Sequence, residues 1–217
     1  MADHDSRDTL IDTIEQGKRL IRLGGDKGLS LAERLAERIN RLAWRTPLHG
    51  LRLNGKHPLK LVAVPDDPIF GDPARGNALL GRQIEWRGEA HDIATLDFTR
   101  PSWSPGFADY LHSFAWLRDL SSVATRAQGA PIAEGVMRAW LARHGENVSD
   151  PAWRADVLGR RILFWSAHAP LILSSADLVY RSAVLNALAR GARHLDRVAD
   201  KMPPGTARVA AWCGITM

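Results

Sequence analysis

Two stretches of the sequence combine aromatic rings with polar side chains that could hold a charged sugar. His112 and Trp116 are four residues apart in YLHSFAWLRDL, and Arg161 and Trp165 are four apart in WRADVLGRRILFW. Residues at this spacing share one face of a helix. A guanidinium binds a carboxylate through two parallel hydrogen bonds, and a tryptophan face attracts cations. These four are therefore candidate substrate-binding residues, with tryptophan packing in the core as the alternative.

The sequence carries none of the common motifs for metal binding, nucleotide binding or serine hydrolysis. The eight histidines are scattered, with no HxxxH or HExxH pair, and the chain has no GxGxxG, P-loop or GxSxG motif. We therefore expect no metal site and no cofactor. The single cysteine, Cys213, rules out a disulfide within the chain. We expect it to be a small buried hydrophobic residue rather than a reactive thiol.

The composition is that of a soluble globular protein, with 217 residues, 45% of them hydrophobic and 24% charged. Net charge is +5, and most of the basic residues are arginine, which is compatible with an anionic partner. Arginines spread along amphipathic helices are the alternative. The N-terminus is polar and acidic, and the longest apolar stretch, HAPLIL, is too short to span a bilayer. We expect a cytoplasmic protein without a membrane partner, although the periplasm stays open.

The first 46 residues predict an N-terminal helical segment. Apolar residues at helical spacing favour one helix over 8–23, which Gly24-Gly25 would end, and a second over 31–44. Ser30 and Glu33 have the spacing of a capping box ahead of the second helix.

Residues 47–101 change character and are rich in Pro, Gly and Asp. Short β-prone runs at 59–64 and 83–86 are candidate strands between these turns. We interpret the whole region as an extended linker element with short strands rather than an independent core.

Residues 102–217 predict successive helices joined by short turns, a pattern typical of antiparallel helical hairpins. Asp150-Pro151 and Ser174 with Asp177 are candidate helix starts, and Gly145 is a candidate stop. The expected helices cover 106–124, 131–144, 151–167, 174–200 and 204 onward.

The last of these helices carries an apolar stripe that has no visible partner. The stripe consists of Val209, Trp212, Ile215 and Met217, and the chain stops on it. An exposed apolar stripe favours an interface whose other half is elsewhere.

The order of these motifs resembles that of a known family. PSWSPGFADYLHSFAWLRDL, then a tryptophan-bearing helix, then PAWRADVLGRRILFW, is similar to the N-terminal part of the heparinase II/III-like polysaccharide lyases. The preceding RGNALLGRQIEWRGE is similar to a short strand element ahead of the helical toroid in that family. The resemblance covers about residues 70–217 and is nearest to bacterial members without a secretion signal.

The resemblance implies a mainly α fold, an incomplete (α/α) toroid of antiparallel helical hairpins. A longer protein would add the remaining toroid helices and a β-sandwich domain. The implied activity is cleavage of acidic, uronate-containing polysaccharide by β-elimination, which needs a carboxylate neutraliser, a base and an acid. In the family the catalytic Tyr and His lie beyond the part matched here. The catalytic residues are therefore unknown, and the 217-residue chain is expected to be inactive alone.

One departure from the family pattern adds a fifth candidate. Many members carry an Asn or His at the start of the helix that corresponds to residues 204–217, where this chain has PPGTAR. Arg208 could supply charge to a substrate there.

Two other classes of function stay open. The chain could be a non-catalytic, arginine-rich helical module that binds nucleic acid or another polyanion, although it has no recognised DNA- or RNA-binding motif. It could also be a helical structural or regulatory protein.

Overall fold

The computed structural model describes residues 35, 39, 46–99 and 102–217. The chain divides into two compact units, Met1–Ala43 and Trp44–Met217. The helices expected over 8–23 and 31–44, and the capping box between Ser30 and Glu33, lie outside the described residues and stay predictions. The linker expected at 47–101 falls in the same compact unit as the helices that follow it.

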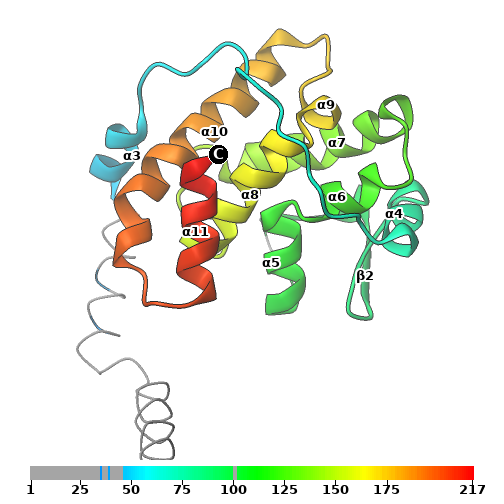
Figure 1. Ribbon diagram of the computed structural model, residues 1–217, viewed down its shortest axis with the longest axis horizontal. Coiled ribbons are helices and arrows are strands. Elements are labelled where there is room, and N and C mark those ends of the chain that lie inside the picture. The colour runs from blue at the N-terminus through cyan, green and yellow to red at the C-terminus, as the bar shows by residue number, and fades with distance from the viewer. Residues whose placement is uncertain (1–34, 36–38, 40–45, 100–101) are drawn as a thin grey trace, which may run out of the picture. The chain divides into compact units, whose positions relative to one another are not determined.

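The second unit is mainly helical (Figure 1). Among the described residues, none of its helices is long and apolar enough to cross a membrane. Its helices are α3 (Pro47–Leu53), α4 (Pro73–Leu80), α5 (Pro105–Ser113), α6 (Trp116–Ser121), α7 (Arg126–His144), α8 (Ala155–Ala167), α9 (Ala169–Ile172), α10 (Leu178–Val198) and α11 (Thr206–Thr216), with 3₁₀ turns η1 (Ile93–Thr95) and η2 (Ala199–Lys201).

Helix α8 is the centre of this unit, because α5, α10 and α11 all pack against it. The closest crossing is with α11. A Cβ atom on Gly214 would lie 2.6 Å from the Cα of Gly159, and one on Gly159 would lie 2.7 Å from the Cα of Ala211. Real Cβ atoms do not come this close to backbone, so the two glycines allow the helices to touch.

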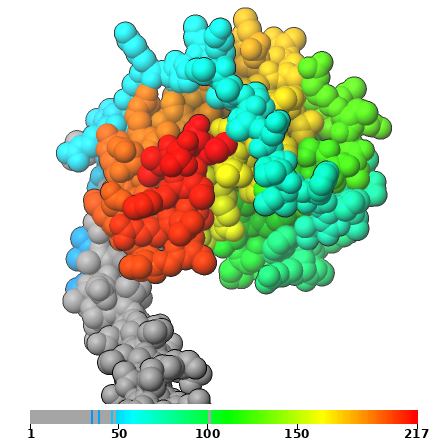
Figure 2. All heavy atoms as spheres, in the orientation of Figure 1, coloured from blue at the N-terminus to red at the C-terminus, as the bar shows by residue number. Residues whose placement is uncertain are grey.

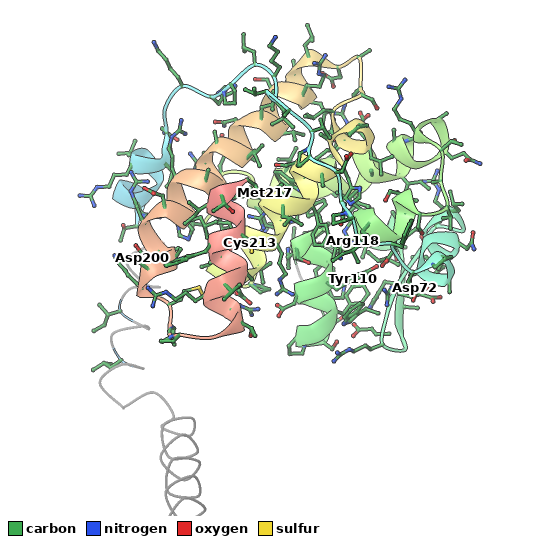
Figure 3. All side chains as sticks on the ribbon, in the orientation of Figure 1. Asp72, Tyr110, Arg118, Asp200, Cys213 and Met217 are labelled. Carbon is green, nitrogen blue, oxygen red and sulfur yellow. The ribbon has the colours of Figure 1, made fainter. Side chains whose placement is uncertain are left out.

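The outer face of α11 is the apolar stripe seen in the sequence. Val209, Trp212, Ile215 and Met217 are 63%, 49%, 47% and 47% exposed. Figure 3 shows Cys213 and Met217 on this helix. The prediction that Cys213 is buried is wrong, since its side chain is exposed, and Ala211 and Gly214 form the buried face instead.

The predicted strand at 83–86 is confirmed as β1 (Gln83–Trp86), and it pairs antiparallel with β2 (Glu89–Asp92). Arg87 and Gly88 join the strands, with φ of 52° and 85°. Two successive left-handed residues make the two-residue turn whose twist matches a hairpin. The hairpin stands beside α4 and α5.

The predicted strand at 59–64 is wrong, because this part of the chain forms neither a strand nor a helix. Its residues have high β propensity, but a strand needs a hydrogen-bonded neighbour, and no described strand lies alongside. Pro58, Pro65 and Pro68 around it also remove backbone donors.

The predicted helix at 106–124 is two helices, because the chain breaks at Phe114. This residue has a left-handed φ of 59°, and its ring is fully buried between Trp116, Trp140 and Trp165. Packing of that ring in the core fixes a backbone turn that helix propensity would not favour.

The remaining helix boundaries are partly as predicted. Helix α7 ends at His144 with Gly145 as its C-cap, which confirms the predicted stop, but a capping box of Thr125 and Gln128 starts it earlier than expected. Helix α8 starts after Arg154 rather than at Pro151. The N-cap of α10 is Asp177, which accepts from the backbone N–H groups of Val179 and Tyr180, and not Ser174.

Candidate functional site

Four of the five residues predicted to bind substrate lie inside the core. His112, Trp116, Arg161 and Trp165 have at most 2% of their surface exposed. They do come together, since the guanidinium of Arg161 lies 5.6 Å from the Trp165 ring and its Nη1 donates to the backbone oxygen of His112 (3.3 Å). The predicted pairing of Arg161 with Trp165 is therefore correct, whereas His112 and Trp116 lie on two different helices, α5 and α6, on either side of the break at Phe114. A polysaccharide has no surface of these four residues to contact.

Arg161 is enclosed by aromatic rings. Its guanidinium lies 4.4 Å from the Trp140 ring and 5.7 Å from that of Trp153, and it also donates to the backbone oxygen of Ala152. Burial lowers its pKa to about 9. Ring faces and carbonyl oxygens thus stabilise this cation in place of a carboxylate, as expected of a core residue.

His112 is likewise buried in the core. The Trp140 indole N–H donates to Nδ1 of His112 (3.1 Å), and the His144 ring lies 5.0 Å away edge-on. Burial first, then the nearby charges of His144 and Arg161, lower the pKa of His112 to about 3. This imidazole is neutral at physiological pH and has no access to a substrate.

Arg208, the fifth candidate, is on α11 and separate from the others. Its Nη2 lies 3.8 Å from an Asp200 carboxylate oxygen, and its guanidinium lies 5.3 Å from the Trp212 ring. Its side chain is 31% exposed, so of the five candidates it is the one a ligand could reach.

A hollow of about 390 Å³ elsewhere on the unit offers an accessible combination of aromatic and charged groups. It lies where the segment before α4 meets β1, α5 and α6; Figure 3 labels Asp72, Tyr110 and Arg118 in this region. Its lining residues are Ile69, Phe70, Gly71, Asp72, Arg75, Trp86, Tyr110, Ala115, Arg118 and Asp119.

The wall of this hollow is an aromatic pair. The Trp86 ring stacks on Tyr110 with 4.4 Å between centroids and 14° between planes. The guanidinium of Arg75 lies 5.0 Å from the Trp86 ring. Trp86 is half-buried, whereas Phe70 at the rim is 94% exposed. A half-exposed indole beside a cation is a common platform for a flat ligand face.

Beneath the wall, one buried carboxylate organises the polar groups. Asp119 accepts from Tyr110 Oη (2.6 Å), Arg75 Nε (2.8 Å) and the backbone N–H of Asp72 (2.7 Å). Burial and the bond to Asp119 raise the pKa of Tyr110 well above its ordinary value. Tyr110 therefore keeps its proton and acts as a donor, not as a base.

Arg118 fixes the opposite rim. It donates to both carboxylate oxygens of Asp67 (2.7 and 2.9 Å), and His168 Nε2 lies 3.2 Å from the same carboxylate. Burial opposes ionisation of Asp67, but the bond to Arg118 lowers its pKa below the usual value. The Arg118–Asp67 pair holds the chain before α4 against α6, and His168, the N-cap of α9, contacts the same carboxylate.

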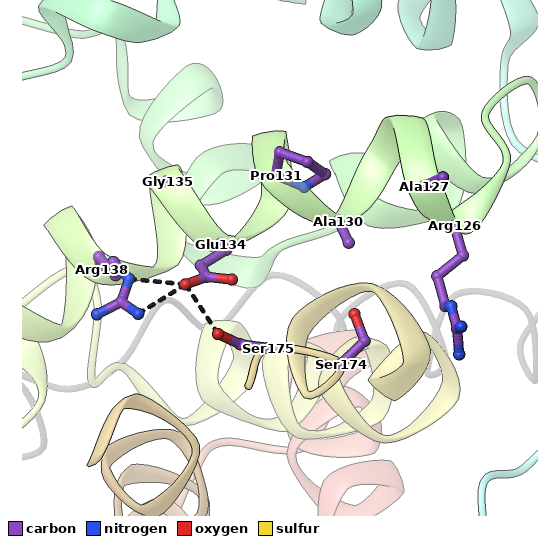
Figure 4. A pocket seen from close by; sticks show the side chains of 9 residues that line it. All are labelled: Arg126, Ala127, Ala130, Pro131, Glu134, Gly135, Arg138, Ser174 and Ser175. Atoms are coloured by element: carbon purple, nitrogen blue, oxygen red, sulfur yellow. Dashed lines mark hydrogen bonds and ion pairs between the residues drawn. The ribbon is translucent and has the colours of Figure 1, made fainter. Parts of the chain in front are cut away.

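A larger hollow of about 630 Å³ lies between α7 and the loop before α10 (Figure 4). Arg138 donates there to Glu134 (2.6 Å) and Asp177 (2.8 Å), and Ser175 Oγ donates to the same Glu134 oxygen (3.1 Å). No aromatic ring lines this hollow, so it offers no stacking face to a ligand. The Trp86 hollow is therefore the better candidate for ligand recognition.

Sequence reasoning missed the Trp86 hollow, although Arg75 and Trp86 both stand in RGNALLGRQIEWRGE, the stretch compared with the strand element of the lyase family. Arg75 and Trp86 come from a helix and a strand, so no helical spacing relates them to Asp119. Among the described residues, no group of three or more His, Cys, Asp or Glu is arranged to hold a metal ion.

Comparison with curated proteins gives a relative that matches part of its own length. No family model matches the chain, and no solved structure matches it. FtsZ-localized protein C of Caulobacter vibrioides (strain NA1000 / CB15N) is 30% identical over 169 residues, which are 77% of this chain and 29% of that protein. The chain thus spans less than a third of the length of the curated relative it matches.

Proposed function

We propose that this chain is a helical binding module of a protein that localises with FtsZ. The similarity to FtsZ-localized protein C carries the proposal. Its 169 matched residues exceed the length of the first unit, Met1–Ala43, so the match must include much of the second. The likeness therefore extends into the folded unit that holds the Trp86 hollow.

Binding rather than catalysis is supported by the state of two groups that could otherwise transfer a proton, Tyr110 and His112. Tyr110 donates to Asp119, and His112 accepts from Trp140 inside the core. A general base must be deprotonated and within reach of the proton it removes. In the described residues, these two groups serve the packing of α5 against α6 and α7.

Localisation tests the proposal directly. The 217-residue chain, fused to a fluorescent protein, is expressed in cells that also carry labelled FtsZ, and the purified chain is tested for capture by immobilised FtsZ. We expect fluorescence to coincide with FtsZ. Uniform fluorescence in cells that contain localised FtsZ, together with no capture, would refute the proposal.

A second candidate function is the binding of acidic polysaccharide, as the start of a heparinase II/III-like toroid. The observation that favours it is the Trp86 hollow, where an indole face lies beside Arg75 and near Arg118. We propose that a uronate ring would stack on the indole while its carboxylate approaches a guanidinium. The helices α5 to α11 would then be the first part of the toroid.

Binding of heparin-like, hyaluronate and alginate polymers to the intact chain tests this second function. We expect Trp86→Ala to weaken binding at least about tenfold, because it removes the stacking face, while Trp212→Ala on α11 leaves it unchanged. We also expect no rise in ultraviolet absorbance from an unsaturated uronate product. Equal binding by both variants, with unchanged melting temperatures, would remove the hollow from consideration.

A further inference from the structure

Helix α3 packs against α10, and the surface that they share carries a cluster of positive charge. Figure 1 shows α3 beside α10, and in Figure 2 both reach the surface on the same side of the unit. The cations come from α3, the turn after it, α10 and η2, and all but one of them are exposed. We call them the basic face: Arg52, Lys56, Arg193, Arg197 and Lys201.

The charge of the basic face is not neutralised by carboxylates. In the part of the chain that the structure describes, none of its side chains forms an ion pair, whereas Arg75, Arg118 and Arg138 elsewhere all do. Cations gathered on one surface repel one another, and an anionic partner that binds among them relieves this repulsion. The basic face is therefore complementary to a negatively charged partner.

Backbone oxygens hold two of these arginines in place. Arg193 donates to the backbone oxygens of Leu53 (2.9 Å) and Lys56. Arg197 donates to those of Arg193 (2.7 Å) and Arg52 (3.4 Å). A carbonyl oxygen has no net charge, so these bonds orient the guanidinium groups without neutralising them. Each guanidinium has five N–H donors and keeps some for a carboxylate, and less entropy is lost on binding because the side chains are already ordered.

The cations of both segments act together on His49 of α3. Burial lowers the pKa of His49 below its ordinary value, and nearby positive charges lower it further, namely those of Arg197, Arg52, Arg190 and Lys201. Arg190 is 4% exposed and adds its charge from the interior. The field that disfavours a proton on His49 is the field that attracts an anion.

An acidic segment of a protein fits this surface better than nucleic acid or lipid does. Single-stranded nucleic acid is bound where aromatic rings stack on the bases, and residues 47–57 and 190–201 contain no Trp, Tyr or Phe. Asp196 and Asp200 are exposed near the cations and would repel a phosphate at every nucleotide or a uniformly anionic membrane. A peptide carries its carboxylates at separate positions, and Leu51, 64% exposed on α3, can contact its apolar side chains.

We propose that the basic face binds an acidic segment of a partner protein. Carboxylates of that segment accept the remaining N–H groups of Arg193 and Arg197, and the other cations of the face add to the attraction. The elements that carry the basic face are not those that line the Trp86 hollow. The inference is therefore independent of that hollow and of localisation with FtsZ.

Binding of a fluorescent oligoglutamate to the intact chain, followed by fluorescence anisotropy at low salt, tests the proposal. Arg52→Glu with Lys201→Glu reverses two exposed charges of the face and should weaken binding at least about tenfold. The matched control is Arg82→Glu with Arg126→Glu, which changes the net charge equally at exposed arginines outside the face and should weaken binding less than about twofold. Raised salt should also weaken binding, because exposed charges are screened.

Four results would overturn the proposal. The first is no binding of oligoglutamate at low salt, and the second is an affinity that ignores salt. The third is equal weakening by the two pairs of reversals, which would mean that only net charge matters. The fourth is tighter binding of an oligothymidylate of equal charge, or of phosphatidylglycerol vesicles, that the face variant abolishes, because the face would then bind nucleic acid or lipid.

Far-ultraviolet circular dichroism of each variant checks that the helices are retained. If the reversal of Arg52 and Lys201 unfolds the chain, Arg52→Gln with Lys201→Gln removes the same two charges more mildly. It should weaken binding of oligoglutamate about threefold or more, and unchanged binding by this folded variant would equally overturn the proposal.

Discussion

The crossing of α8 and α11 makes a quantitative prediction, because one glycine sets the distance between them. In Gly159→Ala, the new Cβ would meet the carbonyl oxygen of Ala210 and lie 2.7 Å from the Cα of Ala211. These are backbone atoms of a helix, so they cannot rotate away as a side chain could. Either α11 moves outward or the backbone strains.

Two opposing contributions decide the magnitude. Replacing glycine by alanine within a helix stabilises it by about 0.5–1 kcal/mol, because alanine loses less backbone entropy. Overpacking a well-packed contact costs about 1–3 kcal/mol. The overpacking should dominate, and we expect Gly159→Ala to lower the free energy of unfolding by about 1–2 kcal/mol.

Gly135 on α7 supplies the matched control, since a Cβ there would meet nothing within 4 Å. Gly135→Ala should raise the free energy of unfolding by about 0.5–1 kcal/mol. Both glycines lie inside helices, so the helix-propensity gain cancels in the difference between the variants. The difference then isolates the cost of overpacking at the crossing.

Urea unfolding followed by far-ultraviolet circular dichroism measures both variants. Hydrogen exchange over 206–216 shows whether α11 detaches while the rest stays folded, and Gly159→Ala should speed exchange there. If Gly159→Ala stabilises the protein as much as Gly135→Ala does, α8 and α11 do not cross at backbone contact and the packing described for α11 is incorrect.

Two other predictions concern the buried polar groups. Burial holds the folded pKa values of His112, His144 and His194 at about 3, 4 and 3, below 6.5. These histidines are therefore neutral in the folded protein and stabilise it fully above pH 6.5. As the pH drops from 6.5 toward 4, the free energy of unfolding should fall by about 1.4 kcal/mol per pH unit for each histidine. Urea unfolding at several pH values measures this, and a free energy of unfolding that does not change with pH would contradict it. Asp119→Asn should destabilise the fold by about 2 kcal/mol, since it replaces a buried carboxylate that accepts from Tyr110, Arg75 and the backbone N–H of Asp72. Asp200→Asn, at an exposed pair, should cost under about 0.5 kcal/mol by the same measurement, and equal effects would contradict the role of Asp119.

The sequence predicted the helical class and most helix positions, because amphipathic spacing and glycine stops are local signals. It failed where a distant contact overrides local preference. Phe114 breaks a helix because its ring packs among tryptophans from α6, α7 and α8. Likewise, the residues at 59–64 have strand propensity but no strand beside them.

The candidate site was not predicted, because it too depends on distant contacts. Helical spacing correctly brought Arg161 and Trp165 together, but spacing does not say which face of a helix turns inward. Only the packing of α5, α10 and α11 around α8 shows that this face is buried. The Trp86 hollow joins residues from a hairpin and three helices, a juxtaposition that depends on tertiary structure alone.

The ion pairs of the arginines indicate how strongly ligand binding should depend on salt. Net charge is +5, yet Arg75, Arg118, Arg138 and Arg154 each pair with aspartate or glutamate, and Arg161 is buried. Nucleic-acid binding depends on cations that are available to release counterions from phosphates. Arginines already neutralised by carboxylates contribute little to that release. At the Trp86 hollow, whose arginines are paired with carboxylates, we therefore expect binding to depend on stacking and only weakly on salt, and a steep loss of affinity with salt would contradict this.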